Sequence, residues 1–257
     1  MDGHGARDRN FYHRRRKTVE IYLDNSATSF PKPECVYTAM DRYMRTNGAS
    51  AGRGTYARAR DAEELIYKTR KSIASLFEAP KPGNIVLTGN VTESLNMILK
   101  GYLKEGDTVL TSDIEHNAVW RPLHQLSRDR GIRIRTFHCS PQGRIDLDEV
   151  ETLLDPAVAL VALIHGSNVI GNIVPVREIA AIAHRKEIPV MVDAAQTAGT
   201  YPVSIRDMEV DFLAFTGHKG LMGPMGTGGF YIRGRNYAQN TQRGRDRHSF
   251  KVCIPAG

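Results

Sequence analysis

From residue 85 to residue 216, short apolar runs alternate with longer amphipathic stretches, and this alternation constrains the fold more than any other feature of the chain. Strands that are separated by helices of about 10–15 residues form a mostly parallel sheet that is covered on both faces. The predicted strands are 85–88, 108–111, 132–137, 158–164, 190–193 and 212–215, and the predicted helices are 92–103, 118–130, 146–154 and 176–186.

The chain before residue 85 is expected to add a short strand and two helices. Ile21-Tyr-Leu23 predicts the strand, and a polar turn follows it. Helices are predicted from Glu34 to about Thr46 and from Ala57 to about Phe77, because apolar residues of the second stretch recur at helical spacing.

The positive charge of the chain lies at its two ends. The net charge is +7, to which residues 1–20 contribute +3 and residues 233–257 contribute +5, so the body between them carries −1. A nucleic-acid binder carries its basic patch on the folded surface. We therefore expect no nucleic-acid binding, and we expect residues 1–20 to be a disordered basic extension.

The cysteines and the hydropathy exclude several classes of protein. Cys35, Cys139 and Cys253 are far apart and lack the CxxC spacing of a zinc site, so no disulfide framework or metal site is expected. A reducing cytoplasm is the default compartment for such a chain. No apolar stretch approaches the roughly 18 residues that span a bilayer, and no membrane association is expected.

Polar residues follow each predicted strand, at the edge where a parallel sheet binds its ligands. Gly89-Asn-Val91-Thr92 opens a helix and can bind a phosphate through backbone N–H groups, or it is an ordinary helix start that Thr92 caps. His116 can stack on a planar ligand or transfer a proton, or it is a surface residue. Asn168 can donate a hydrogen bond from a polar loop.

The last two strand ends carry a carboxylate and a lysine. Asp193 ends an apolar strand, where a buried carboxylate needs a cation. Lys219 follows Thr216-Gly-His218 and is either a solvated turn residue or a Schiff-base lysine. Together with the residues above, this set fits pyridoxal phosphate: Asp193 would pair with the ring nitrogen, Gln196 or Asn168 would bond the phenolic oxygen, and Lys219 would form the Schiff base.

Six motifs occur in the order typical of one enzyme family, between about residues 21 and 232. They are Tyr22-Leu-Asp-Asn-Ser-Ala-Thr-Ser, Gly89-Asn-Val-Thr-Glu-Ser-Leu-Asn, Glu115-His-Asn-Ala-Val-Trp-Arg-Pro-Leu, Ser167-Asn-Val-Ile-Gly, Val192-Asp-Ala-Ala-Gln and Thr216-Gly-His-Lys. By these motifs the chain resembles the class V aminotransferases, and most closely the cysteine desulfurases and selenocysteine lyases.

The resemblance implies a fold and a set of site residues. The fold is the large domain of a fold-type I pyridoxal-phosphate enzyme, an α/β/α sandwich with a mostly parallel sheet, in a homodimer with its active site at the subunit interface. The implied roles are phosphate binding by Val91, Thr92, Thr216 and His218, ring stacking by His116, ring-oxygen bonding by Asn168 and Gln196, ring-nitrogen pairing by Asp193, and covalent attachment and proton transfer by Lys219.

The resemblance also implies a reaction. Cysteine desulfurases remove sulfur from L-cysteine to give L-alanine and an enzyme persulfide. The persulfide supplies sulfur to acceptor proteins and to iron–sulfur cluster assembly. The nucleophilic cysteine and the arginine that binds the substrate carboxylate lie in a C-terminal portion that this chain is expected to lack, with most of the small domain, so its activity is expected to be impaired. Cys35 and Cys139 are expected to be structural thiols. Another class V reaction (transamination, epimerisation or kynureninase-like cleavage) and a non-catalytic product are the alternatives.

Three segments are therefore predicted: the extension 1–20, a pyridoxal-phosphate-binding domain 21–232, and a basic tail 233–257 that matches no family motif. Codons for residues 242–251 can be chosen so that a one-base shift reads Lys-Glu-Gly-Gly-Thr-Gly-Ile-His-Ser-Lys, which resembles the glycine-rich segment expected next in the family. We therefore expect a frameshift near residue 233. A short homologue with an unrelated tail is the alternative.

Overall fold

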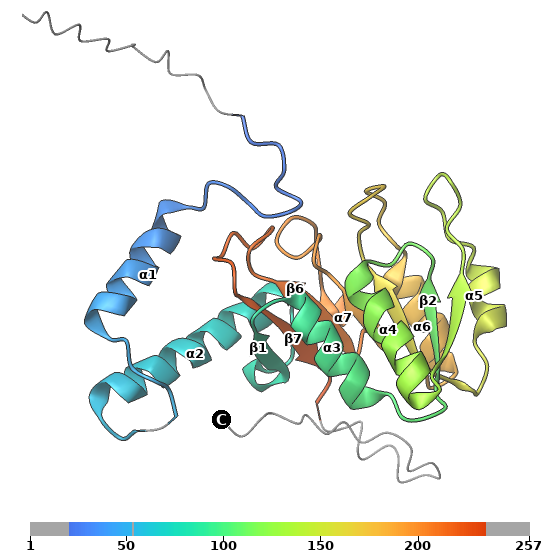
Figure 1. Cartoon of the computed structure of the whole chain (residues 1–257), viewed down its shortest axis with the longest axis horizontal. Helices are drawn as coiled ribbons and strands as arrows, with labels where there is room; N and C mark the ends of the chain where they lie inside the picture. The colour runs from blue at the N-terminus through green and yellow to red at the C-terminus, as the bar shows by residue number, and fades with distance from the viewer. Residues whose placement is uncertain (1–20, 53, 235–257) are drawn as a thin grey trace, which may run out of the picture.

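The computed structural model describes residues 21–52 and 54–234 (Figure 1). The predicted extension, almost all of the basic tail and Cys253 lie outside these residues. The helices are α1 (Glu34–Thr46), α2 (Ala57–Leu76), α3 (Val91–Tyr102), α4 (Asn117–Arg130), α5 (Leu147–Leu153), α6 (Val176–Arg185) and α7 (Ile205–Met208). The strands are β1 (Ile85–Thr88), β2 (Thr108–Ser112), β3 (Arg133–Phe137), β4 (Val158–Ile164), β5 (Val190–Asp193), β6 (Phe212–Thr216) and β7 (Gly228–Ile232).

One seven-stranded sheet organises the described chain, in the order β1-β7-β6-β5-β4-β2-β3. Every neighbouring pair is parallel except the two that β7 makes with β1 and β6. The expected mostly parallel sheet is confirmed. The chain runs outward from β2 to β3 and then returns to β4 on the other side of β2, so a topological switch point lies between β2 and β4.

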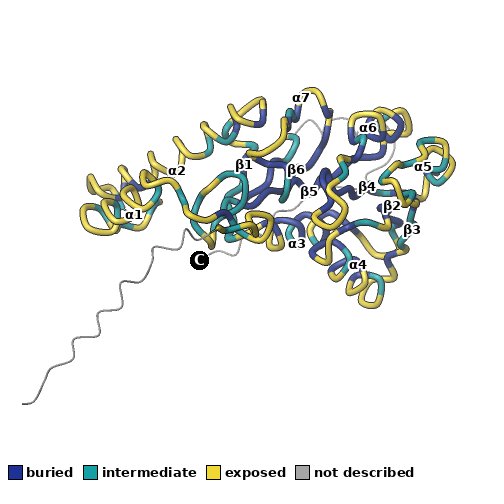
Figure 2. Tube along the Cα trace, turned by 90° about the horizontal axis from the view of Figure 1, so that it is seen from above, coloured by how far each residue is buried: buried dark blue, intermediate teal, exposed yellow. Residues whose placement is uncertain are grey.

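The strands bury alternate residues in two separate cores. In β4, Val161 and Leu163 belong to the core beneath α2, α5, α6 and α7, whereas Leu160 and Ala162 belong to the core beneath α3 and α4. Figure 2 shows these two groups of helices on opposite sides of the sheet. Because both faces are covered, β4 is apolar throughout, and β5 and β6 are apolar up to their last residues, without alternating polar positions.

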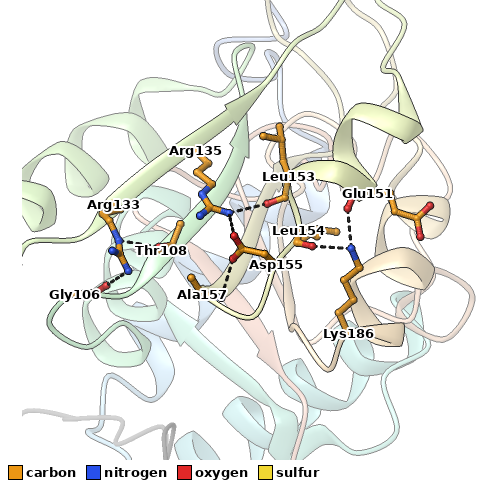
Figure 3. Close-up of polar contacts among 10 residues, drawn as sticks. All are labelled: Gly106, Thr108, Arg133, Arg135, Glu151, Leu153, Leu154, Asp155, Ala157 and Lys186. Carbon is orange, nitrogen blue, oxygen red and sulfur yellow. Dashed lines mark hydrogen bonds and ion pairs between the residues drawn. The ribbon is translucent and has the colours of Figure 1, made fainter.

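The outer strand β3 is protected by charged side chains. Arg133 Nε donates to Thr108 Oγ1 at 3.1 Å, and Arg135 Nη1 donates to Asp155 Oδ2 at 2.7 Å (Figure 3). Nearby, Lys186 Nζ donates to the carbonyl oxygens of residues 151 and 154 at 2.7 and 2.6 Å. Charges on an edge strand discourage pairing with another chain.

The predicted strand at 21–23 is wrong. Ile21 and Leu23 are 75% and 89% exposed, and neither pairs with a strand. Instead, the segment is irregular, the Tyr22 hydroxyl donates to the carbonyl oxygens of Asp24 and Thr28, and a turn follows at residues 25–27. The sequence prediction also omitted α7, a 3₁₀ turn at Pro82–Asn84 and the strand β7. No helix in the described part of the chain combines the length and the apolar character needed to cross a membrane.

Candidate functional site

The polar residues expected to form the site follow β1, β2, β4, β5 and β6 at one edge of the sheet. Val91 and Thr92 begin α3 after β1, His116 follows β2, and Asn168 follows β4. The remaining residues, Asp193, Gln196, Thr216, His218 and Lys219, lie at or just beyond the ends of β5 and β6. The switch point between β2 and β4 places His116 and Asn168 on either side of the crevice where such sheets bind ligands.

The start of α3 has the donors of an anion site. Asn90 caps this helix, because its Oδ1 accepts from the backbone N–H of Glu93 at 2.9 Å. The alternative in which Thr92 is the cap is therefore wrong. Among the described residues, the backbone N–H groups of Val91 and Thr92 have no acceptor, and they lie at the positive end of the helix dipole.

Gly228 holds β7 against this helix start. A side-chain carbon on Gly228 would lie 2.7 Å from the Cα and carbonyl carbon of Asn90. The first residue of β7 therefore must be glycine for the strand to approach α3 so closely.

His116 lies near the same helix start. Its Nδ1 accepts from the Ala118 N–H at 3.0 Å, so in the neutral ring the proton is on Nε2. Thr92 and His116 line one pocket of about 290 Å³, which also includes Arg121. Thr92, one of the two candidate anion-binding residues, and the imidazole thus share one opening, although they are about 25 residues apart in sequence.

Asp193 and Lys219 influence each other across the ends of β5 and β6. Asp193 is 2% exposed, and burial raises the pKa of its carboxyl, while the Ala195 N–H, His116 and Lys219 act in the opposite direction. Burial lowers the pKa of Lys219, and the Asp193 carboxylate opposes this. The buried Asp193 carboxylate thus has Lys219 as a nearby cation. Because its pKa is lowered, the Lys219 amine is more often neutral than the amine of a solvent-exposed lysine.

The turn that carries Lys219 is closely packed. A side-chain carbon on Gly220 would lie 2.5 Å from the carbonyl oxygen of Ala198, and one on Gly199, whose φ is +86°, would lie 2.6 Å from the backbone of Gly220. Both glycines are needed for this backbone approach, which places Lys219 beside the end of β5.

The two polar residues of the same motif are partly engaged within the protein. Thr216 is buried, and its Oγ1 lies 3.4 Å from the carbonyl oxygen of Thr227. His218 Nδ1 lies 3.1 Å from Thr28 Oγ1. Burial lowers the pKa of His218, as do the charges of Lys219 and Lys32, so the imidazole is neutral near pH 7.

The side-chain amides of Gln196 and Asn168 differ in exposure and in hydrogen bonding. Gln196 is half-buried and its Nε2 donates to the carbonyl oxygen of Ser26 at 3.2 Å. Asn168 is exposed in the turn after β4, and its side chain forms no hydrogen bond within the described residues. Asn168 therefore has donors and acceptors available for a ligand.

Two residues of the site were not singled out from the sequence. Glu115 is buried, and the Asp193 carboxylate influences its pKa. Its position three residues after the end of β2, immediately before His116, was the available signal. Lys32 bonds the backbone of His218, and no sequence pattern connects residues so far apart.

The two described cysteines are both free thiols. Cys35 is exposed on α1, and Cys139 is partly buried. Burial and the nearby Asp113 carboxylate raise the pKa of Cys139. A raised pKa lowers the thiolate fraction, so Cys139 is a poor nucleophile.

This donor set fits a phosphorylated pyridine aldehyde. Unpaired amides at a helix start suit a phosphate, a buried carboxylate suits a protonated ring nitrogen, and an amine with a lowered pKa suits a carbonyl.

Known proteins resemble this chain over most of its described length. The family model described as Aminotransferase class-V matches residues 21–247. A probable cysteine desulfurase of Methanothermobacter thermautotrophicus is 36% identical over 212 residues, which are 82% of this chain and 52% of that protein. A cysteine desulfurase of Haloferax volcanii is 32% identical over 219 residues, which are 83% of this chain and 51% of that protein.

Solved structures of cysteine desulfurases also resemble this chain. The apo structure of a cysteine desulfurase from Thermococcus onnurineus superimposes with a TM-score of 0.80 at 37% identity, covering 85% of this chain and 55% of that one. The cysteine desulfurase CsdA from Escherichia coli superimposes with a TM-score of 0.73 at 32% identity, covering 82% and 54%. The chain spans about half the length of the curated relatives that it matches.

Proposed function

Because this chain belongs to the class V aminotransferase family, we propose that it binds pyridoxal phosphate and acts in a cysteine desulfurase. The reaction would convert L-cysteine to L-alanine and transfer the sulfur to a cysteine thiol as a persulfide. The observation that carries the proposal is that a buried Asp193 and a half-buried Lys219 lie close enough to shift each other's pKa at the same end of the sheet as the unpaired amides of α3.

Each residue has a task that its surroundings support. Bound pyridoxal phosphate supplies an electron sink that stabilises a carbanion at the substrate Cα. The amides of Val91 and Thr92, with Thr216 and His218, would hold the phosphate, and Asp193 would hold the proton on the ring nitrogen. The amine Nζ of Lys219 would attach the cofactor and then move the proton at the substrate Cα, for which a lowered pKa is suitable.

The remaining roles concern the ring and its oxygen. His116 would cover one face of the ring, because its hydrogen bond from Ala118 fixes the imidazole plane. Asn168 and Gln196 would bond the ring oxygen. We do not assign the sulfur-accepting thiol to Cys139, since burial and Asp113 raise its pKa.

Cofactor binding is tested by covalent trapping. The chain is incubated with pyridoxal phosphate, reduced with borohydride and digested, and we expect the added mass on the peptide that contains Lys219. Lys219→Ala should lose the label, whereas Lys186→Ala, which alters a lysine on the other side of the fold, should retain it. Labelling spread equally over several lysines would contradict the assignment.

The reaction is tested by product analysis on the same preparation. Incubation with L-cysteine and a thiol reductant should yield alanine and sulfide in equal amounts, at the impaired rate that the sequence leads us to expect. Keto-acid formation or racemisation instead would indicate another class V reaction. Cofactor trapping without any product would indicate a binding protein that does not catalyse.

We further propose the setting in which this activity operates. Residues 21–232 would form the cofactor-binding domain of a cytoplasmic homodimer that passes sulfur to an acceptor protein of iron–sulfur cluster assembly. Membership of the family supports the dimer and the sulfur transfer. The free thiols of Cys35 and Cys139 support a reducing compartment. Sedimentation in the presence of pyridoxal phosphate tests the dimer, and a monomer at all concentrations would contradict it.

A further inference from the structure

Residues 24–32, which we call the strap, cross the turn that carries Lys219. Four donors of the strap converge on one acceptor, the carbonyl oxygen of His218. These are the backbone N–H of Ser29 at 3.0 Å, Thr28 Oγ1 at 3.1 Å, Ser29 Oγ at 3.2 Å and Lys32 Nζ at 2.7 Å. Ser26 adds a further link, because its carbonyl oxygen accepts from Gln196 Nε2.

The other side of the same turn is also fixed. Gly220 lies directly against Ala198 and Gly199, as the close backbone approach described above shows. Within the turn, the Met222 N–H donates to the carbonyl oxygen of Lys219 at 2.8 Å. The peptide that joins His218 to Lys219 is therefore held between the loop after β5 and the strap.

Lys32 supplies the one charged donor among these four. Its Nζ lies 2.7 Å from Ser29 Oγ, 2.7 Å from the His218 carbonyl oxygen and 3.5 Å from Thr28 Oγ1. All three acceptors are uncharged oxygens, so the ammonium is directed at the backbone and not at a carboxylate. A hydrogen bond from a charged donor is roughly twice as strong as a neutral one.

We propose that Lys32 is a positioning residue for Lys219. By closing the strap onto the His218 carbonyl, it fixes the backbone from which the Lys219 side chain reaches the cofactor. The effect on cofactor attachment rests on the proposed function, whereas the closure of the strap does not depend on it. Without the Lys32 donor, the strap opens and the Lys219 turn becomes mobile.

The first measurement is amide hydrogen exchange of the chain without cofactor. It compares wild type with Lys32→Met, Lys32→Arg and Lys186→Met. The last variant is a matched control, because Lys186 Nζ also donates to two backbone carbonyls (Figure 3). Lys186 precedes β5, whereas the site follows the carboxyl ends of the strands, so the control lies at the opposite end of the sheet. The reporters are the amides of Ser29 and Met222.

We expect Lys32→Met to speed exchange at both reporters by about tenfold or more, as the loss of a charged hydrogen bond implies. Lys186→Met should leave them unchanged, and Lys32→Arg should restore wild-type exchange. Should Lys32→Met fail to fold, Lys32→Gln gives the same comparison with an uncharged donor. Equal exchange in Lys32→Met and Lys186→Met, or no change in either, would overturn the proposal.

The second measurement is the rate of pyridoxal phosphate trapping at Lys219. We expect about a tenfold slower rate in Lys32→Met than in Lys186→Met, with recovery in Lys32→Arg. If wild type traps no cofactor, the proposed function fails and the exchange data still decide whether the strap depends on Lys32. If wild type and Lys32→Met trap cofactor equally fast, the positioning role is refuted.

Discussion

Replacing the buried Glu115 by glutamine should remove a pH dependence of stability. Glu115 is 7% exposed, and its Oε1 accepts from Ser112 Oγ at 2.6 Å and from the Ile164 N–H at 2.7 Å. Its Oε2 has no polar partner among the described residues. Burial raises the pKa of Glu115 from 4.5 to about 8, against the two hydrogen bonds and with a smaller contribution from Asp193.

The direction in which stability changes with pH depends on whether the folded or the unfolded chain binds the Glu115 proton more tightly. Because the pKa of Glu115 is higher in the folded chain, the protonated carboxyl gives the fold its full stability below pH 4.5. This stability decreases as the pH rises to about 8 and stays at the lower value above that pH. The separation of the two pKa values, at about 1.36 kcal/mol per pH unit, gives an upper bound of about 5 kcal/mol. Water entering around the ionised carboxyl reduces this penalty, so we expect about 2–4 kcal/mol.

Glu115→Gln removes the titration and keeps an oxygen that can accept both hydrogen bonds. The assay is urea unfolding of wild type and variant between about pH 5 and pH 9, followed by circular dichroism. The variant should match wild type at the acid end and exceed it by about 2–4 kcal/mol at the alkaline end. A matched control is Glu63→Gln, on the exposed face of α2. Parallel stability curves for wild type and Glu115→Gln would refute the reasoning.

Three further substitutions test the site and the core. Gly220→Ala places a carbon 2.5 Å from the Ala198 carbonyl oxygen, so we expect a loss of about 1–3 kcal/mol in urea unfolding, and a stable variant would contradict the close approach. Asp193→Asn removes the carboxylate that holds up the pKa of Lys219, so acylation of Lys219 should reach half its maximal rate at lower pH; an unchanged midpoint would show that the two groups are not coupled. Leu163→Ala opens a cavity in a fully buried position of β4 and should cost about 2–5 kcal/mol, and a loss below about 1 kcal/mol would show that the core collapses around it.

The alternation of apolar runs was sufficient to predict the strands from β1 to β6 and the helices from α3 to α6. These elements are strongly apolar or amphipathic; the helices satisfy their own backbone, and β2 to β6 each pair with a strand that is close in sequence, whereas β1 pairs with the distant β7. The failures involve contacts that periodicity does not record. Ile21-Tyr-Leu23 is apolar enough for a strand, but it pairs with no strand among the described residues, and the Tyr22 hydroxyl donates to the Thr28 carbonyl oxygen in the strap instead.

The site could be anticipated where a residue ends a strand. Asp193 and Thr216 are the last residues of β5 and β6, and Lys219 comes three residues after β6, so the rule that ligands bind at the carboxyl ends of parallel strands selects them as candidates. Lys32 could not be found this way, because it comes from a different part of the chain and its function depends on one backbone carbonyl. Which of the candidate residues bind a cofactor remains a prediction for the trapping experiment.

The position of β7 has a consequence for how the chain folds. Among the described residues, β1 pairs only with β7, the last of the described strands in sequence, so β1 has no strand neighbour there until residues 228–232 are present. Loop closure over so long a segment is slow, as is typical of non-local strand pairing. We therefore expect a chain stopped on the ribosome after β6 to be cleaved by protease around β1 and α3 while β4 and β5 are protected; equal protection of both regions would contradict this order. The same pairing brings Gly228 against Asn90, so the unpaired N–H groups of Val91 and Thr92 reach their final surroundings only after residues 228–232 have been synthesised.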